Sequence, residues 1–105
     1  MTPSWIASRT LLAVKPGGEE ILITVRLGKP YEISSEEWAC PAAIDGLHQR
    51  LHDMHGVDAW QTIQLVQGLL AQLLGHFVEA GGKLYWPETR EPVELGELFP
   101  YVQRA

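Results

Sequence analysis

The longest uncharged segment of the chain runs from Ala59 to Val78 and contains no Asp, Glu, Lys or Arg. Apolar residues recur in it at steps of three and four, as they do on one face of an α-helix. Asp58 precedes the segment as a good N-cap, Gln61 takes the third helical position of a capping box, and Gly81-Gly82 follows as a stop. The pattern predicts one long helix over residues 58–79. The stripe expected to lie on a sheet is Ala59, Ile63, Val66, Leu70, Leu73 and Phe77.

A β-hairpin is expected near the N-terminal end of the chain. Residues 5–14 are rich in β-forming side chains, and residues 20–27 alternate with the period of a strand. Residues 15–20 between them contain Pro16 and two glycines, which suit a turn. The side chains expected to face the helix are Ile21, Ile23, Val25 and Leu27.

The remaining segments complete a β-β-β-α-β order. Residues 38–44 alternate as a third strand, and residues 45–56 form a polar connector that contains three histidines. Residues 83–86 form a short strand that Pro87 ends. Residues 88–105 form an acidic C-terminal tail with at most a short turn near Leu95. We therefore expect a single α+β domain over residues 1–105, with two layers: an antiparallel sheet and one long helix packed on one face of it.

Composition narrows the function classes. The net charge is −5 and no two basic residues are adjacent, so the basic footprint of a nucleic-acid-binding protein is missing. The single cysteine, Cys40, excludes an intramolecular disulfide. The N-terminal residues lack the pattern of a secretory signal, which makes a cytoplasmic location the expectation. Four glutamines in the uncharged segment argue against a membrane span.

Two groups of residues could carry chemistry. His48, His52 and His55 lie close together, and a helical turn there would place two imidazoles at the spacing of zinc ligands. Gln49 stands where a metalloprotease motif needs its glutamate, and no cysteine pair anchors the segment. Cys40 has no local nucleophile signature and fits a buried strand position. We therefore expect no cofactor and no structural metal, and these residues favour a non-enzymatic protein over an enzyme. Metal or ligand binding by residues 48–55 is the alternative.

The composition of the polar face of the long helix indicates that another chain or another part of the protein packs against it. A normal exposed helix face carries charges, whereas this one carries glutamines and glycines, and each glycine costs about 1 kcal/mol of helix stability relative to alanine. Close approach of another backbone would explain that cost. The residues expected in such an interface are Leu65, Gly68, Leu69, Gln72 and Gly75. The partner is either a second copy, giving a homodimer, or an unidentified protein. The other explanation is that the tail, through Leu95, Leu98 and Phe99, folds back over this face.

Several short segments resemble a family of small bacterial proteins known only as a domain of unknown function. They are residues 38–41, 44–47, 56–59 with Gln61, and 84–86. The most specific part is the run Gly-Val-Asp-(Ser or Ala)-x-Gln that opens the helix, here with Ala59. The resemblance implies a bacterial, cytoplasmic α+β domain and implies no activity. The sequence as a whole favours a non-enzymatic interaction or homo-oligomeric module.

Overall fold

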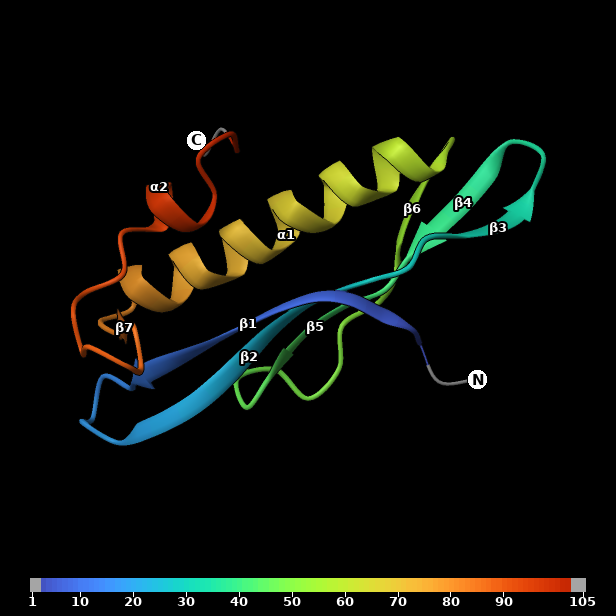
Figure 1. Ribbon diagram of the computed structural model, residues 1–105. Coiled ribbons are helices and arrows are strands. Elements are labelled where there is room, and N and C mark those ends of the chain that lie inside the picture. The colour runs from blue at the N-terminus through green and yellow to red at the C-terminus, as the bar shows by residue number, and fades with distance from the viewer. Residues whose placement is uncertain (1–2, 103–105) are drawn as a thin grey trace.

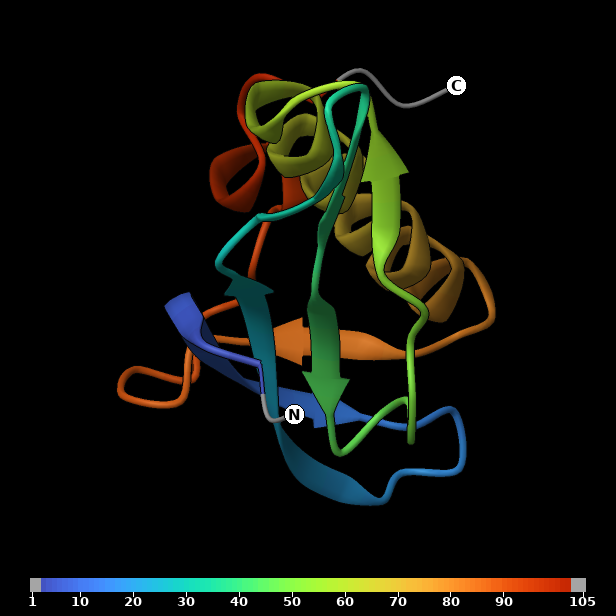
Figure 2. The same ribbon diagram turned by 90° about the vertical axis from the view of Figure 1, so that its right-hand side faces the viewer.

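The computed structural model describes residues 3–102 of the chain. One long helix lies along strands that belong to two antiparallel sheets (Figures 1 and 2). The expected α+β class is therefore confirmed. In chain order the elements are β1 (Trp5–Val14), β2 (Glu20–Gly28), β3 (Tyr31–Ser34), β4 (Glu37–Cys40), β5 (Ala42–Asp45), β6 (Met54–Gly56), α1 (Ala59–Glu79), β7 (Lys83–Tyr85) and α2 (Leu95–Leu98).

The first sheet has the strand order β5-β2-β1-β7. The expected hairpin is present: β1 and β2 pair from Trp5 opposite Gly28 to Val14 opposite Glu20, with a bulge near Trp5. Alternation along β2 sets the faces as predicted, since Ile23 is fully buried and its neighbour Leu22 is 63% exposed. A one-residue slip in register would reverse these faces.

The expected third strand over residues 38–44 is wrong, because the chain there forms two strands in two different sheets. β4 ends at Cys40 and β5 begins at Ala42, with Pro41 between them. Proline has no N–H to donate to a ladder, so it interrupts strand pairing. The Pro41 carbonyl accepts a hydrogen bond of 2.9 Å from the Gly28 N–H, which keeps the break close to the end of β2.

The second sheet has the order β3-β4-β6 and was not expected. β6 arises inside the polar connector of residues 45–56 and pairs with β4. The β3–β4 hairpin projects past the start of α1 (Figure 1), and all four residues of β3 are exposed. The radius of gyration is 14.3 Å, against about 13 Å for a compact domain of this length. The molecule is therefore elongated along α1.

Both ends of α1 are capped as the sequence predicts. The Asp58 carboxylate accepts a 2.8 Å hydrogen bond from the Gln61 N–H at the start. At the other end Gly81, with φ of +105°, donates to the Val78 carbonyl, and Gly82 donates to the Phe77 carbonyl. This pair of bonds is a Schellman motif, which favours glycine at the left-handed position.

The buried side of α1 is wider than the predicted stripe. Val66 and Leu70 of that stripe are buried, and Ile63, Leu73 and Phe77 pack against the core as half-buried side chains. The fully buried helix residues are Thr62, Val66, Leu70, Ala71 and Leu74. Three of them lie outside the stripe because the helix touches both sheets and the C-terminal segment, not one sheet alone.

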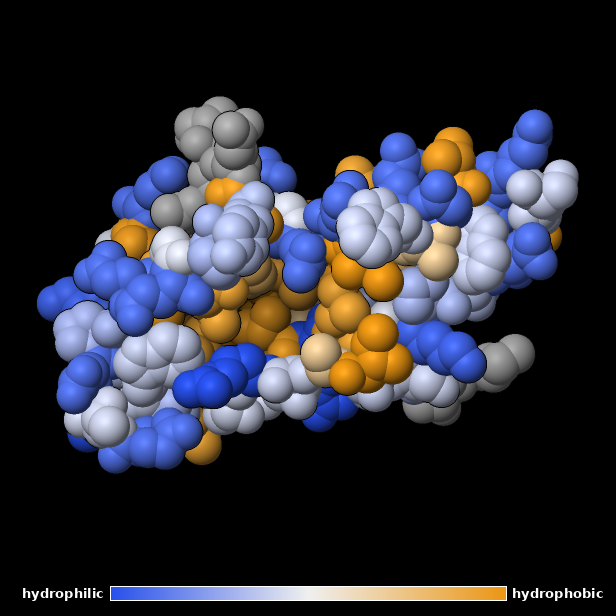
Figure 3. All heavy atoms as spheres, turned by 45° about the horizontal axis from the view of Figure 1, so that its top comes forward, coloured by the Kyte–Doolittle hydropathy of each residue, from blue (hydrophilic) through white to orange (hydrophobic). Residues whose placement is uncertain are grey.

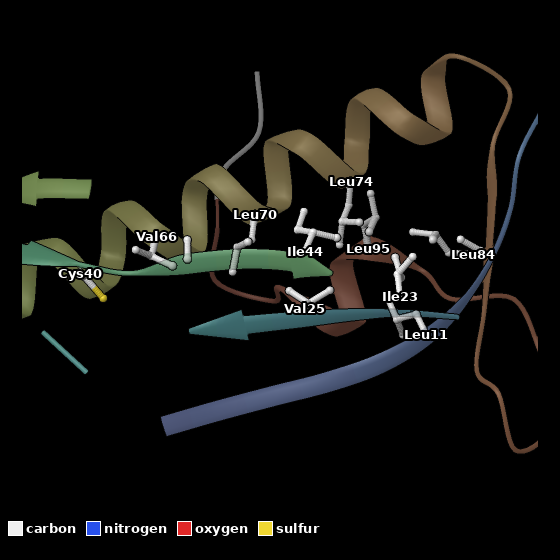
Figure 4. Close-up of a cluster of buried hydrophobic side chains, with 12 residues drawn as sticks. Leu11, Ile23, Val25, Cys40, Ile44, Val66, Leu70, Leu74, Leu84 and Leu95 are labelled. Carbon is white, nitrogen blue, oxygen red and sulfur yellow. The ribbon is translucent and has the colours of Figure 1, made fainter. Parts of the chain in front are cut away.

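The main core lies between α1 and the first sheet (Figure 4). Leu11, Ile23 and Ile44 from the strands meet Leu70 and Leu74 of the helix there. The acidic C-terminal segment contributes as well, because Leu95 of α2 is 9% exposed and belongs to the same cluster. Residues 103–105 of that segment, and residues 1–2, lie outside the described part of the chain.

Candidate interaction surface

The outer edge of β1 is open along much of its length. β7 pairs with β1 at Leu12, Ala13 and Val14, and within residues 3–102 no other strand lies beside the rest of that edge. Residues 6–10, which we call the β1 edge, are five consecutive exposed residues. Side chains on both faces of this strand segment are therefore accessible, and one row of its backbone groups has no strand partner.

A groove lies on the helix-facing side of the β1 edge. Register places Ala7 opposite Leu27 and Arg9 opposite Val25, and Val25 is on the face that packs under α1. Ala7 and Arg9 are nevertheless exposed, so the helix layer does not cover this part of β1. Figure 3 shows hydrophobic side chains gathered in a hollow between α1 and β1. We call this hollow, with Val25 and Leu27 beside the β1 edge, the β1–α1 groove.

Arg9 places a cation in this groove. Its guanidinium carbon lies 4.4 Å from the centre of the Trp86 ring, which is a cation–π contact. Among residues 3–102, no carboxylate lies within 4.0 Å of the Arg9 side chain. The sequence pattern did not reveal the site, although one signal was present: Arg9 shares a strand face with Leu11, which is fully buried.

The helix row expected at an interface is only partly open. Gly68 is half-buried, and it lines a shallow depression together with Leu98, Phe99 and Tyr101 of the C-terminal segment. Leu69 is half-buried against the core, and Gly75 is half-buried. Leu65 is 36% exposed and Gln72 is exposed. The C-terminal segment thus occupies the Gly68 side, while Leu65 and Gln72 face outward.

Exposed apolar side chains also lie at the start of α1, one just before the helix and one in its first turn. Trp60 is 75% exposed and Val57 is 61% exposed. Tryptophan side chains are enriched at protein interfaces because they combine a large apolar body with one polar N–H.

The three histidines do not share a helix face, because residues 46–53 are irregular and β6 follows. The His48 N–H donates to the Ile44 carbonyl in a turn, and His55 on β6 pairs with Glu37 at 2.8 Å. His52 lines an open depression of about 530 Å³ together with Arg50 and Asp53. Within residues 3–102, no group of three or more His, Cys, Asp or Glu side chains has the arrangement of a metal site.

Cys40 is a buried thiol. Its side chain is 0% exposed, and its Sγ donates to the Gly28 carbonyl at 3.2 Å. Burial raises the pKa of the Cys40 thiol, because the apolar surroundings disfavour the thiolate. Nucleophilic catalysis requires an accessible thiolate, so this environment gives no support to such a role.

These features define a small α+β domain with one helix on two antiparallel sheets and an open strand edge beside an apolar groove. The chain belongs to a family whose model is described as "Domain of unknown function (DUF6968)" and matches residues 7–96. The resemblance seen in the sequence is thus confirmed. No curated protein and no solved structure gives a significant match. In residues 3–102, no helix has the length and hydropathy needed to cross a membrane.

Proposed function

We propose that this protein is a non-enzymatic interaction module that binds another protein chain along the β1 edge. The observation that carries the proposal is the run of exposed residues 6–10 in a strand that is paired on one side, directly beside the β1–α1 groove. Soluble domains usually protect such edges, because unpaired N–H and C=O groups accept a further strand. An open edge next to an apolar hollow is therefore a favourable place for strand addition.

The domain already contains one example of such an addition. β7 lies antiparallel on the same edge of β1, with Leu84 opposite Ala13. The Leu84 side chain is 4% exposed and belongs to the core, so an added strand here can send alternate side chains under the helix layer. A partner strand would continue this arrangement along residues 6–10. Main-chain hydrogen bonds would contribute affinity, and the groove would select among side chains.

The partner is a second copy of the chain or a different protein. For a homodimer the helix row is the competing surface, since Leu65 and Gln72 face outward and are uncharged. The setting we propose is the bacterial cytoplasm, which the single unpaired and buried Cys40 supports.

Site-specific photocrosslinking in cells tests the proposal. A photoreactive amino acid would replace Ile6 on the edge, Leu65 on the helix row, or Leu22 on the outer face as a control, because all three are exposed. We expect a crosslinked product from position 6 and none from position 22. The mass of the product separates a homodimer from a complex with another protein. Products from position 65 alone, or from no position, would overturn binding at the β1 edge.

Two substitutions with the same charge provide a matched control. Ala7→Lys puts a long charged side chain on the groove side of β1, whereas Ser8→Lys puts it on the opposite face. We expect Ala7→Lys to abolish the crosslink from position 6 and Ser8→Lys to retain it. Light scattering at micromolar concentration, with Leu65→Lys for the helix row, measures self-association independently.

A second candidate function is ligand or metal binding by the histidine segment. The observation in its favour is the depression where His52, Arg50 and Asp53 come together. Elemental analysis that finds about one zinc per chain, lost in a His48→Ala/His52→Ala variant, would support it.

A further inference from the structure

We propose that the strand which binds the β1 edge carries an acidic side chain opposite Arg9, with an apolar side chain two residues away, opposite Ala7. This inference rests on the interaction function proposed above and names the chemistry of the partner. It follows from the position of Arg9 within the β1–α1 groove, because side chains of a paired strand alternate between faces and those opposite one another lie on the same face.

Register identifies which positions of the partner enter the groove. Ala7, Arg9 and Leu11 share the helix-facing side of β1, since they pair with Leu27, Val25 and Ile23 of β2. A partner residue opposite Arg9 would have its own neighbour, two positions away, opposite Ala7. Ala7 is small and exposed beside the apolar groove, so that position favours an apolar side chain. Leu11 is fully buried and lies next to the residues that β7 covers, so the partner does not reach it.

The Arg9 guanidinium is suited to bind a carboxylate. It lies over the Trp86 ring at 4.4 Å, and stacking on an aromatic face leaves the N–H groups at its rim free. A carboxylate can accept two of these N–H groups in the planar, bidentate geometry that arginine prefers. In residues 3–102 the Arg9 guanidinium forms no ion pair within 4.0 Å.

The same cation would reject other strands. An inward-pointing charge at a sheet edge prevents indiscriminate pairing, because an apolar strand laid on it would desolvate the charge without compensation. Binding of an acidic residue removes that penalty, so Arg9 supplies specificity by repulsion as well as by attraction.

Charge complementarity favours a different protein over a second copy. Residues 5–14 contain no Asp or Glu, so β1 of one chain cannot supply the carboxylate to Arg9 of another. Antiparallel pairing of two β1 edges about Ser8 would put Arg9 opposite Ala7 and bring the two Arg9 cations onto one face. The occupant we infer is therefore an extended segment of another protein.

Selection from a random dodecapeptide library displayed on phage tests this inference with the full-length protein. We expect peptides retained by the wild type and by Ser8→Lys, but lost by Ala7→Lys, to contain Asp or Glu with an apolar residue two positions away on one side. Affinity for such a peptide should fall roughly tenfold in Arg9→Gln, as expected for a lost charged hydrogen bond. A lysine in place of its acidic residue should weaken binding to the wild type and restore it to Arg9→Glu.

The outcomes separate the two proposals. Peptides that need the β1 edge but show no acidic preference, or bind Arg9→Gln as tightly as the wild type, would overturn the role of Arg9 and leave the interaction function standing. Selection that yields no peptide sensitive to Ala7→Lys would overturn peptide binding at the edge altogether. Thermal unfolding of each variant shows whether the fold is retained.

Discussion

Asp58 and Gln61 cap the start of α1 with two hydrogen bonds, one made by each side chain. The Asp58 carboxylate accepts from the Gln61 N–H at 2.8 Å, and the Gln61 side-chain oxygen accepts from the Val57 N–H at 2.8 Å. The second bond reaches one residue further back than in the usual capping box. Glycine at position 56 leaves room for this arrangement, because a Cβ there would lie 2.6 Å from the same Gln61 oxygen and displace it from Val57. The Gly-Val-Asp-Ala-x-Gln run is thus explained by helix initiation.

This cap predicts the effect of substitution at Asp58. Asp58→Ala should lower the free energy of unfolding by about 1 kcal/mol, because the Gln61 N–H loses its acceptor. Asp58→Ser, which retains an oxygen at the N-cap, should stay close to the wild type. Urea denaturation followed by circular dichroism measures both. Equal stability of the two variants would contradict the capping role.

The alternation of β2 predicts opposite outcomes at adjacent positions. Ile23→Asp should lower the free energy of unfolding by roughly 4 kcal/mol or more, because it buries an unpaired carboxylate. Leu22→Asp should leave the domain folded, since Leu22 is 63% exposed on the other face. Thermal melting distinguishes them. A normal melting temperature for Ile23→Asp would refute the assigned faces.

Gly28 is expected to be intolerant of a side chain. A Cβ at Gly28 would lie 2.6 Å from the Cβ of Pro41 and within 2.9 Å of two further ring atoms, and the ring is rigid. Gly28→Ala should therefore cost about 1–3 kcal/mol through overpacking at the junction of the two sheets. Gly17→Ala is the control, because a Cβ at Gly17 meets nothing within 4 Å. Chemical denaturation of the two variants in parallel measures the difference.

Gly68 should behave in the opposite way. A Cβ at Gly68 would meet nothing within 4 Å, so Gly68→Ala should stabilise α1 by up to about 1 kcal/mol. If the backbone of a partner approached Gly68, the same substitution would weaken association instead. Denaturation and light scattering on one sample separate the two effects. Loss of a wild-type dimer in Gly68→Ala would restore the helix row as the interface.

The Cys40 thiol should be unreactive in the folded protein. Burial raises its pKa above the ordinary value of 9.0, whereas unfolding exposes the thiol and returns its pKa to that value. The stability contributed by this group is therefore complete below about pH 9 and is lost as the pH rises through the folded pKa. Ellman's reagent at pH 8 should label the folded protein far more slowly than the urea-denatured protein. Rapid labelling of the folded protein would show that Cys40 is accessible.

The sequence by itself determined the elements whose signals are local. The helix over Ala59–Glu79 follows from an apolar period, an N-cap and a glycine stop, and the β1–β2 hairpin follows from alternation and a turn. Each of these signals acts within a few residues of the element it specifies. The fold class followed from the same information, because a long helix with an apolar stripe and strands with one apolar face must cover each other.

Tertiary structure decided the features that depend on neighbours distant in sequence. β6 exists because Met54–Gly56 can pair with β4, and the interruption at Pro41 becomes a change of sheet because Gly28 packs against its ring. Leu95 is buried because the C-terminal segment reaches the end of the core beside Leu74 and Leu84. The open edge of β1 has the same origin: β7 is three residues long and covers three residues of a ten-residue strand. The sequence of β1 does not specify how long its neighbour β7 will be. Residues 6–10 therefore have the sequence of an ordinary strand, and they become a candidate binding site only in the folded molecule.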